Sequence, residues 1–144
     1  MTPSTAPVTA PTTDTRSTKA NGLVLAAFRV VVSFLFGCHG LQGFGMFGGI
    51  DGQGTPVPFG SFPGWWGSVL ELVCSALVLV GVAVRPAALL CSGAMAYAYF
   101  VVHQPTGLLP LQNLGEPAAV YSWSFLLIAV LGPGSYTLAR AFRR

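Results

Sequence analysis

Four long apolar stretches dominate this sequence and leave the chain few ways to fold. They cover residues 22–41, 64–84, 86–102 and 117–138. Each approaches the roughly 20 residues that an α-helix needs to cross about 30 Å of hydrocarbon. Lys and Arg supply only 7 and Asp and Glu only 4 of the 144 residues, too few for a water-facing surface. Because open strands cannot satisfy their backbone groups in lipid, we expect an all-α fold, a four-helix transmembrane bundle in the lipid bilayer.

The beginning of the chain has a different character. Residues 1–21 are rich in Thr, Pro, Ser and Ala and contain almost no large apolar side chain. Such a segment cannot bury enough apolar surface to offset the entropy lost on ordering. We therefore expect a disordered cytoplasmic tail over residues 1–21 and a single membrane domain over residues 22–144.

The end of the first apolar stretch also resembles a lipoprotein cleavage box, with Cys38 as the residue that would be acylated. Two residues argue against cleavage. Arg29 places a charge in the middle of the apolar core, which is foreign to a signal peptide, and Phe36 is bulky where a cleavage site prefers small residues. We expect the first stretch to be retained as a membrane helix.

The distribution of positive charge predicts the orientation of the bundle. Short loops rich in Lys and Arg remain in the cytoplasm. The six basic residues outside the apolar stretches all fall on one predicted side: Arg16, Lys19, Arg85, Arg140, Arg143 and Arg144. The connections 42–63 and 103–116 contain no Lys or Arg. Both termini are therefore predicted to be cytoplasmic. So few basic residues also exclude a nucleic-acid partner, because binding phosphates requires clustered cations.

Ionisable side chains inside the apolar stretches mark the candidate chemistry, because a charge in lipid costs several kcal/mol. A rise of about 1.5 Å per residue places His39 and His103 near the outer face and Glu71 about 10 Å below it. Together with Glu116, these side chains are placed to converge in one polar cluster. Carboxylate and imidazole groups exchange protons near neutral pH. Glu71, His39 and His103 are therefore the candidate catalytic residues.

Three further residues are candidates for binding a substrate or cofactor: Arg29, Tyr99 and Glu116. Arg29 lies roughly 10 Å from the cytoplasmic end of its stretch. Its side chain either extends to the cytoplasmic surface or pairs inside the bundle with Glu71 or with an anionic ligand. Tyr99 lies on a helical stripe that leads to His103. That stripe either faces the polar cluster or packs against a neighbouring helix.

The cysteines and histidines suggest two other kinds of site, which we weigh separately. Cys38, Cys74 and Cys91 form no CxxC pair and lie at different estimated depths. This disfavours dithiol–disulfide exchange, which needs two thiols within reach of each other, and favours simple packing. Two histidines at equal depth would suit a haem, although nothing else in the sequence asks for one. No spacing of residues indicates a metal site.

Several short motifs follow one another in a specific order between residues 22 and 138. They are Arg29, HGLQGFGMFGG (39–49), VLELV around Glu71, LVGVAVRPAALL (79–90), GAMAYAYF (93–100) followed by His103, NLGEPAAVY (113–121) and LGPGSYTL (131–138). In this order they resemble the DoxX family of small bacterial membrane proteins. The resemblance implies a four-helix, multi-pass protein of the bacterial inner (plasma) membrane.

The same resemblance implies a link to quinone-coupled oxidation of sulfur compounds or to redox-stress complexes. We therefore expect a component of a quinone-linked redox system, with quinone as the cofactor. Glu71 with His39 or His103 would exchange the proton that accompanies quinone chemistry. Two alternatives stay open: a non-catalytic accessory subunit of a larger membrane complex, or a small transporter that works as a homo-oligomer. Whether the chain is itself an enzyme also stays open.

Overall fold

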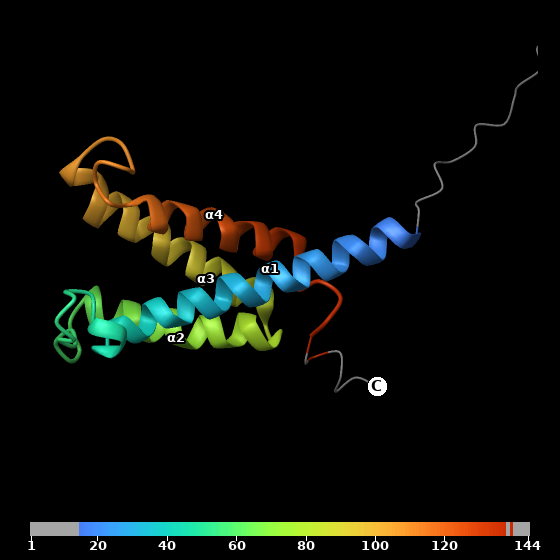
Figure 1. The fold of residues 1–144 in the computed structure, drawn as a ribbon, viewed down its shortest axis with the longest axis horizontal. Coiled ribbons are helices and arrows are strands. Elements are labelled where there is room, and N and C mark those ends of the chain that lie inside the picture. The colour runs from blue at the N-terminus through green and yellow to red at the C-terminus, as the bar shows by residue number, and fades with distance from the viewer. Residues whose placement is uncertain (1–14, 138, 140–144) are drawn as a thin grey trace, which may run out of the picture.

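The computed structural model describes residues 15–137 and residue 139. Four α-helices form one bundle: α1 (Thr15–Gln42), α2 (Gly64–Val80), α3 (Val84–Tyr97) and α4 (Glu116–Leu131). Successive helices run in opposite directions (Figure 1). No strand occurs in the described part of the chain. The prediction of an all-α four-helix bundle is confirmed.

Two short helical segments extend or connect the main helices. α3 continues without a break into the π-helical segment η2 (Ala98–His103) and the 3₁₀ segment η3 (Gln104–Thr106). A second 3₁₀ segment, η1 (Met46–Gly48), lies in the connection between α1 and α2. Figure 1 shows this connection and the one between α3 and α4 at the same end of the bundle.

The first helix begins earlier than the sequence predicts. Residues 15–21, assigned above to the disordered tail, form the first turns of α1, which project beyond the other helices (Figure 1). A helix satisfies its own backbone and tolerates polar residues such as Lys and Thr outside the apolar region. The rest of the predicted tail, residues 1–14, lies outside the described residues.

The last helix ends earlier than predicted. The fourth apolar stretch extends to residue 138, but α4 stops at Leu131. Gly132 follows with φ of 88°, a conformation that favours glycine, and Pro133 cannot donate the next helical hydrogen bond. The chain then turns back onto α1, where the N–H of Ser135 donates to the carbonyl of Gly22 at 3.3 Å. Apolar composition alone therefore overestimates this helix.

The core is made by all four helices, and the outside of the bundle is also apolar. α1 packs mainly on α2 and α3 mainly on α4, while a tight turn at residues 81–83 joins α2 to α3. Phe36, Val78, Phe125 and Ile128 are completely buried. Large apolar side chains exposed on the outer helix faces include Val31, Phe34, Leu89, Leu90, Trp123 and Val130. Such an apolar exterior suits lipid rather than water.

The lengths of the helices agree with membrane insertion. Thr18–Gln42 and Val84–Thr106 are each long and apolar enough to cross a membrane. Gly64–Val80 and Glu116–Leu131 are equally apolar but shorter, and helices of 17 and 16 residues rise about 25 Å. A bilayer can thin locally to match such helices at a modest energetic cost.

Candidate functional site

The candidate site begins at an unusually close approach of α1 and α2. Gly40 faces α2, and a Cβ atom added there would lie 3.1 Å from the backbone nitrogen of Leu72 and 3.2 Å from the carbonyl oxygen of Ser68. A Cβ on Gly37, one turn earlier, would lie 3.1 Å from Oγ of Ser75. Small residues at such a contact let two membrane helices pack backbone to backbone. The neighbouring side chains of the two helices are thereby brought within reach of each other.

The close approach places His39 of α1 beside Glu71 of α2. Nδ1 of His39 lies 2.9 Å from Oε2 of Glu71. The side chain of Glu71 is 10% exposed and that of His39 is 43% exposed. A buried carboxyl group is therefore joined by a short hydrogen bond to an imidazole that reaches the surface. The structure thus brings together two of the three predicted catalytic residues.

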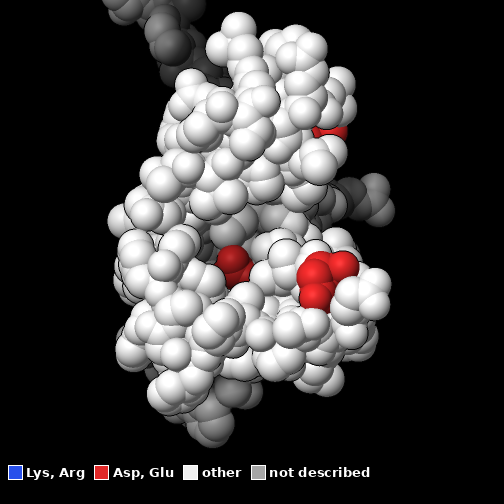
Figure 2. Space-filling view, turned by 90° about the vertical axis from the view of Figure 1, so that its left-hand side faces the viewer, with Lys and Arg blue, Asp and Glu red and all other residues white. Residues whose placement is uncertain are grey.

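This pair lies toward the end of the bundle that carries the connections 43–63 and 104–115. Figure 2 looks onto that end: the described residues show acidic but no basic side chains there, and one acidic group is set back in a hollow. Asp51 in the first connection accepts hydrogen bonds from the backbone N–H groups of Gln53 and Thr55. Hydrogen bonds from Thr55 and Gln53 lower the pKa of Asp51, which keeps it ionised as part of the loop.

Aromatic rings surround the imidazole of His39. Phe36, one turn earlier on α1, stacks parallel to it with ring centroids 6.2 Å apart. Tyr121 of α4 lies tilted against it at 6.4 Å, and Phe125 packs on Phe36 at 4.8 Å. Sequence reasoning missed Tyr121, although it closes the NLGEPAAVY motif quoted above. The pair therefore lies between three helices, with aromatic rings of α1 and α4 on one side.

His103 and Glu116 do not join this pair in the described structure. Nδ1 of His103 is 3.0 Å from the carbonyl oxygen of Asn113, so His103 ties the end of the α3 run to the α3–α4 connection. Asn113 is buried and donates to the carbonyl of Gly107 at 2.7 Å. Glu116 is exposed in the first turn of α4. Among the described residues, neither His103 nor Glu116 contacts His39 or Glu71 through a hydrogen bond or ion pair.

Tyr99 packs against other side chains and does not lie at the pair of His39 and Glu71. It packs against the buried core cluster, and a Cβ on Gly115 would lie 2.9 Å from its Cδ2 atom. Tyr99 therefore fills the contact between the α3 run and the start of α4. Its predicted role in binding a ligand stays a prediction.

Arg29 is buried at the opposite end of α2 and does not reach Glu71. Nη1 donates to the carbonyl of Val78 and, at 2.9 Å, to that of Leu79; Nη2 donates to the carbonyl of Tyr136 at 2.7 Å. The residue is 2% exposed, so the alternative in which its side chain extends to the cytoplasmic surface is wrong. Its guanidinium instead donates to carbonyls in the last turn of α2, where the helix leaves carbonyl groups short of partners; that of Val78 also accepts from the N–H of Gly81.

Cys74 and Cys91 also differ from the prediction. The expectation that they lie at different depths is wrong, because the tight turn between α2 and α3 brings them to the same level and their thiols interact. Both residues are buried in the core cluster and both are free thiols. Cys38 is partly exposed on α1.

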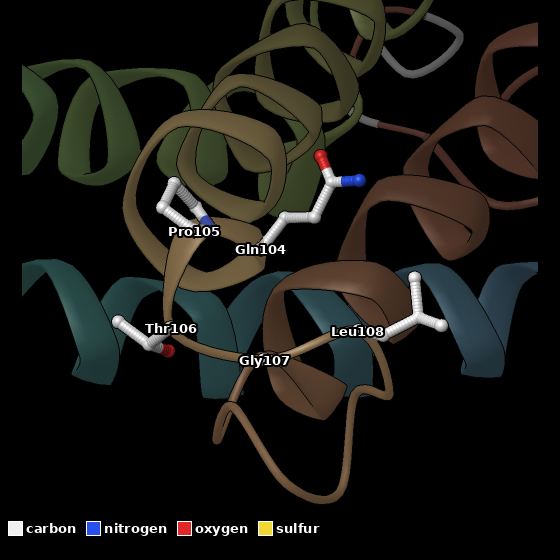
Figure 3. A pocket seen from close by; sticks show the side chains of 5 residues that line it. All are labelled: Gln104, Pro105, Thr106, Gly107 and Leu108. Atoms are coloured by element: carbon white, nitrogen blue, oxygen red, sulfur yellow. The ribbon is translucent and has the colours of Figure 1, made fainter.

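A second hollow, of about 480 Å³, lies in the α3–α4 connection. Figure 3 shows the residues that line it: Gln104, Pro105, Thr106, Gly107 and Leu108. None of these side chains titrates near neutral pH, so this hollow has no group for proton transfer. Within the described residues, no three His, Cys, Asp or Glu side chains are grouped to hold a metal ion.

A helical bundle with an apolar exterior, in which two helices are long and apolar enough to cross a bilayer, is typical of an integral membrane protein. The DoxX family profile matches residues 24–104, a range that includes both members of the pair. The chain belongs to the DoxX family. It is also 35% identical over 126 residues to an uncharacterized protein of Haemophilus influenzae, covering 82% of this chain and 90% of that relative. No solved structure matches the chain.

Proposed function

We propose that the chain is a multi-pass protein of the bacterial inner membrane, crossed by all four helices, with both termini in the cytoplasm. The asymmetry of charge supports this orientation. Lys19 and Arg85 belong to the end where α1 begins and α2 turns into α3, whereas Asp51 and Glu116 belong to the other end (Figure 1). The remaining basic side chains of the prediction lie outside the described part: Arg16, Arg140, Arg143 and Arg144.

Within this frame, the pair of His39 and Glu71 is proposed to exchange protons with a quinone, so that the protein is a component of a quinone-linked redox system. The observation that carries the proposal is the 2.9 Å contact between the partly exposed imidazole and the buried carboxyl group. Oxidation of a bound quinol releases two electrons and two protons, and reduction of the quinone takes up the same number. The electrons are exchanged with a partner protein of the same membrane complex, and this chain supplies the proton path.

The residues at the pair fit a flat ring that carries polar oxygens. Nδ1 of His39 is hydrogen-bonded to Glu71. Nε2 is therefore the ring nitrogen that can form a hydrogen bond with a ligand. The rings of Phe36 and Tyr121 beside it offer aromatic faces for stacking. The apolar outer surface of the helices can contact the isoprenoid tail of the quinone. His39 would therefore orient a quinone oxygen, and Phe36 and Tyr121 would orient the quinone ring.

The two side chains can pass a proton without placing a charge on the imidazole. When Nε2 of His39 takes a proton, its Nδ1 proton can pass to Glu71 across their hydrogen bond. The imidazole then stays neutral and the carboxylate becomes a neutral acid. Low-dielectric surroundings penalise separated charges, and in this transfer only the carboxyl group changes its charge. Glu71 thus holds the proton inside the bundle, and His39 is the group that contacts the quinone.

Two substitutions of Glu71 test this proposal. Glu71→Gln keeps the shape and the hydrogen bonding but cannot hold the proton, so the membrane level should remain normal while quinone-linked turnover in isolated membranes falls about 100-fold or more. Glu71→Leu also removes the partner of His39, and a lower membrane level is expected as well. Glu116→Gln is the matched control, because this exposed carboxylate lies outside the pair.

The result also distinguishes the proposal from a purely structural role. Normal turnover and normal abundance with both Gln and Leu at position 71 would remove Glu71 from the chemistry. The accessory-subunit hypothesis would then be favoured, with the pair serving only helix packing. Quinone extracted from the protein purified in mild detergent gives an independent readout of the cofactor.

A further inference from the structure

A third hollow lies at the predicted cytoplasmic end of the bundle, far along the helices from His39 and Glu71. It has a volume of about 550 Å³ and lies between the α2–α3 turn and the segment that follows α4. Its lining includes Arg85, Pro86, Leu131, Pro133 and Thr137. One cation in an otherwise mostly apolar lining distinguishes this hollow from the polar connection at the other end.

Arg85 is the charged group of the hollow, and its guanidinium is not bonded to any described part of the chain. It is exposed in the first turn of α3 and has no hydrogen-bond or ion-pair partner among the described residues. A Cβ added to Gly132 would lie 3.4 Å from its Nε and Nη2 atoms, so the guanidinium lies beside a residue that has no side chain. In Arg29, by contrast, Nη1 and Nη2 donate to three main-chain carbonyls, and only the buried Nε has no hydrogen-bond partner among the described residues.

The start of α3 adds to the positive character of the hollow. No side chain caps this helix and no acidic residue occurs in its first turn. The first N–H groups of a helix carry a partial positive charge and attract anions. Arg85 and the helix start therefore point to a ligand with negative charge.

The residues around the hollow would place the negative charge of such a ligand at the edge of the apolar outer surface of the bundle. Leu89 lies one turn beyond Arg85 on α3 and is exposed, as is Leu131 at the end of α4. Tyr136, in the segment after α4, is 65% exposed, and aromatic side chains with a polar tip favour the membrane–water interface. A ligand here would have an anionic group at Arg85 and apolar chains beside α3 and α4.

We propose that this hollow binds the headgroup of an anionic phospholipid, with the guanidinium of Arg85 paired to the phosphate. A guanidinium offers parallel N–H donors that match two phosphate oxygens. The described acidic residues are Asp51, Glu71 and Glu116, and none of them lines the hollow. It therefore offers no carboxylate for the ammonium group of a zwitterionic headgroup, and charge complementarity selects a lipid with a net negative charge. This proposal does not depend on the quinone chemistry.

The test is the lipid selectivity of the full chain in nanodiscs that contain equal amounts of phosphatidylglycerol and phosphatidylcholine. Native mass spectrometry of the released protein should show phosphatidylglycerol retained in preference to phosphatidylcholine. Arg85→Gln should lower this preference about fivefold, which corresponds to about 1 kcal/mol for one basic residue at an anionic surface. Arg85→Lys should retain part of it, because a lysine keeps the charge but not the paired donors.

Lys19→Gln is the matched control, because it removes an exposed cation at the same end of the bundle but outside the hollow. It should leave the preference unchanged. An equal loss of the lipid preference in Lys19→Gln and Arg85→Gln would show that only the general positive charge of this end matters. That result would contradict the proposed site. Unchanged selectivity in Arg85→Gln would also overturn it. Displacement of the lipid by equimolar inorganic phosphate would assign the hollow to free phosphate instead.

Discussion

At the scale of single residues, the two ionisable groups buried deepest in the bundle have opposite uses. Arg29 donates to the carbonyls of Val78, Leu79 and Tyr136 and so joins α1 to the end of α2 and to the segment after α4. Glu71 has one partner, the partly exposed His39. Two nitrogens of the first group are bonded to the backbone while its buried Nε has no partner among the described residues, whereas the second group remains connected to the surface through His39.

Arg29 is predicted to stabilise the fold rather than to bind a ligand. Arg29→Leu leaves buried carbonyl groups without donors and should lower the free energy of unfolding by about 3 kcal/mol. Arg29→Lys keeps the charge but loses the fork of donors, so a smaller loss is expected. Thermal unfolding in detergent measures both, with the exposed Arg85→Leu as the control. Unfolding of Arg29→Leu at the temperature of the wild type would contradict this role.

How far the site could be predicted from the sequence depends on the helix geometry around each residue. The constant rise of an α-helix was enough to place His39 and Glu71 at compatible depths. The stripe that joined Tyr99 to His103 assumed an α-helical period, but residues 98–103 form a π-helical segment, which changes the angle per residue. His103 consequently bonds to Asn113. The depth of a residue along its helix could be predicted from the sequence. The direction of a side chain that follows a change of helix type could not.

At the scale of the elements, the contact between α1 and α2 decides whether the pair can form. Gly40 lies against backbone atoms of Ser68 and Leu72, which cannot rotate away as a side chain could. The four apolar stretches predicted the four helices because lipid permits few other structures. Their ends depended on Gly81 and Gly132, C-cap residues with positive φ values that were not evident from hydrophobicity. The same tight α2–α3 turn explains the unpredicted meeting of Cys74 and Cys91.

We predict that a larger residue at position 40 separates α1 from α2. Gly40→Val should destabilise the bundle by about 1–3 kcal/mol, as expected for an overpacked contact, and should also lower quinone-linked turnover by moving His39 away from Glu71. Gly93→Val is the matched control, since a Cβ at this helical glycine meets nothing within 4 Å. Thermal unfolding in detergent distinguishes the two. Equal stability of the two variants would show that the close approach at Gly40 is not required.

At the scale of the whole molecule, the acidic and basic side chains divide between the two ends of the bundle. The charged side chains that Figure 2 shows among the described residues at that end are acidic, and Lys19 and Arg85 belong to the opposite end. This arrangement would put the proton-exchanging pair toward the outer face and the proposed lipid site toward the cytoplasm. One chain would thus offer different chemistry to the two leaflets.

The orientation can be measured with single cysteines in a background whose native cysteines are replaced by alanine. A membrane-impermeant maleimide should label Asp51→Cys in intact cells with an opened outer membrane. Lys19→Cys, at the other end of the bundle, should react only after the inner membrane is permeabilised. The reverse pattern would contradict the predicted topology.

The most direct test of the central claim, proton exchange at Glu71, is redox-difference infrared spectroscopy of the protein in quinone-containing membranes. Electrochemical reduction and reoxidation of the quinone should produce a band from the protonated carboxyl group, because Glu71 alternates between acid and carboxylate. The band should be lost in Glu71→Gln and kept in Glu116→Gln. A band that persists unchanged in Glu71→Gln, or no carboxyl band in the wild-type protein, would contradict the account.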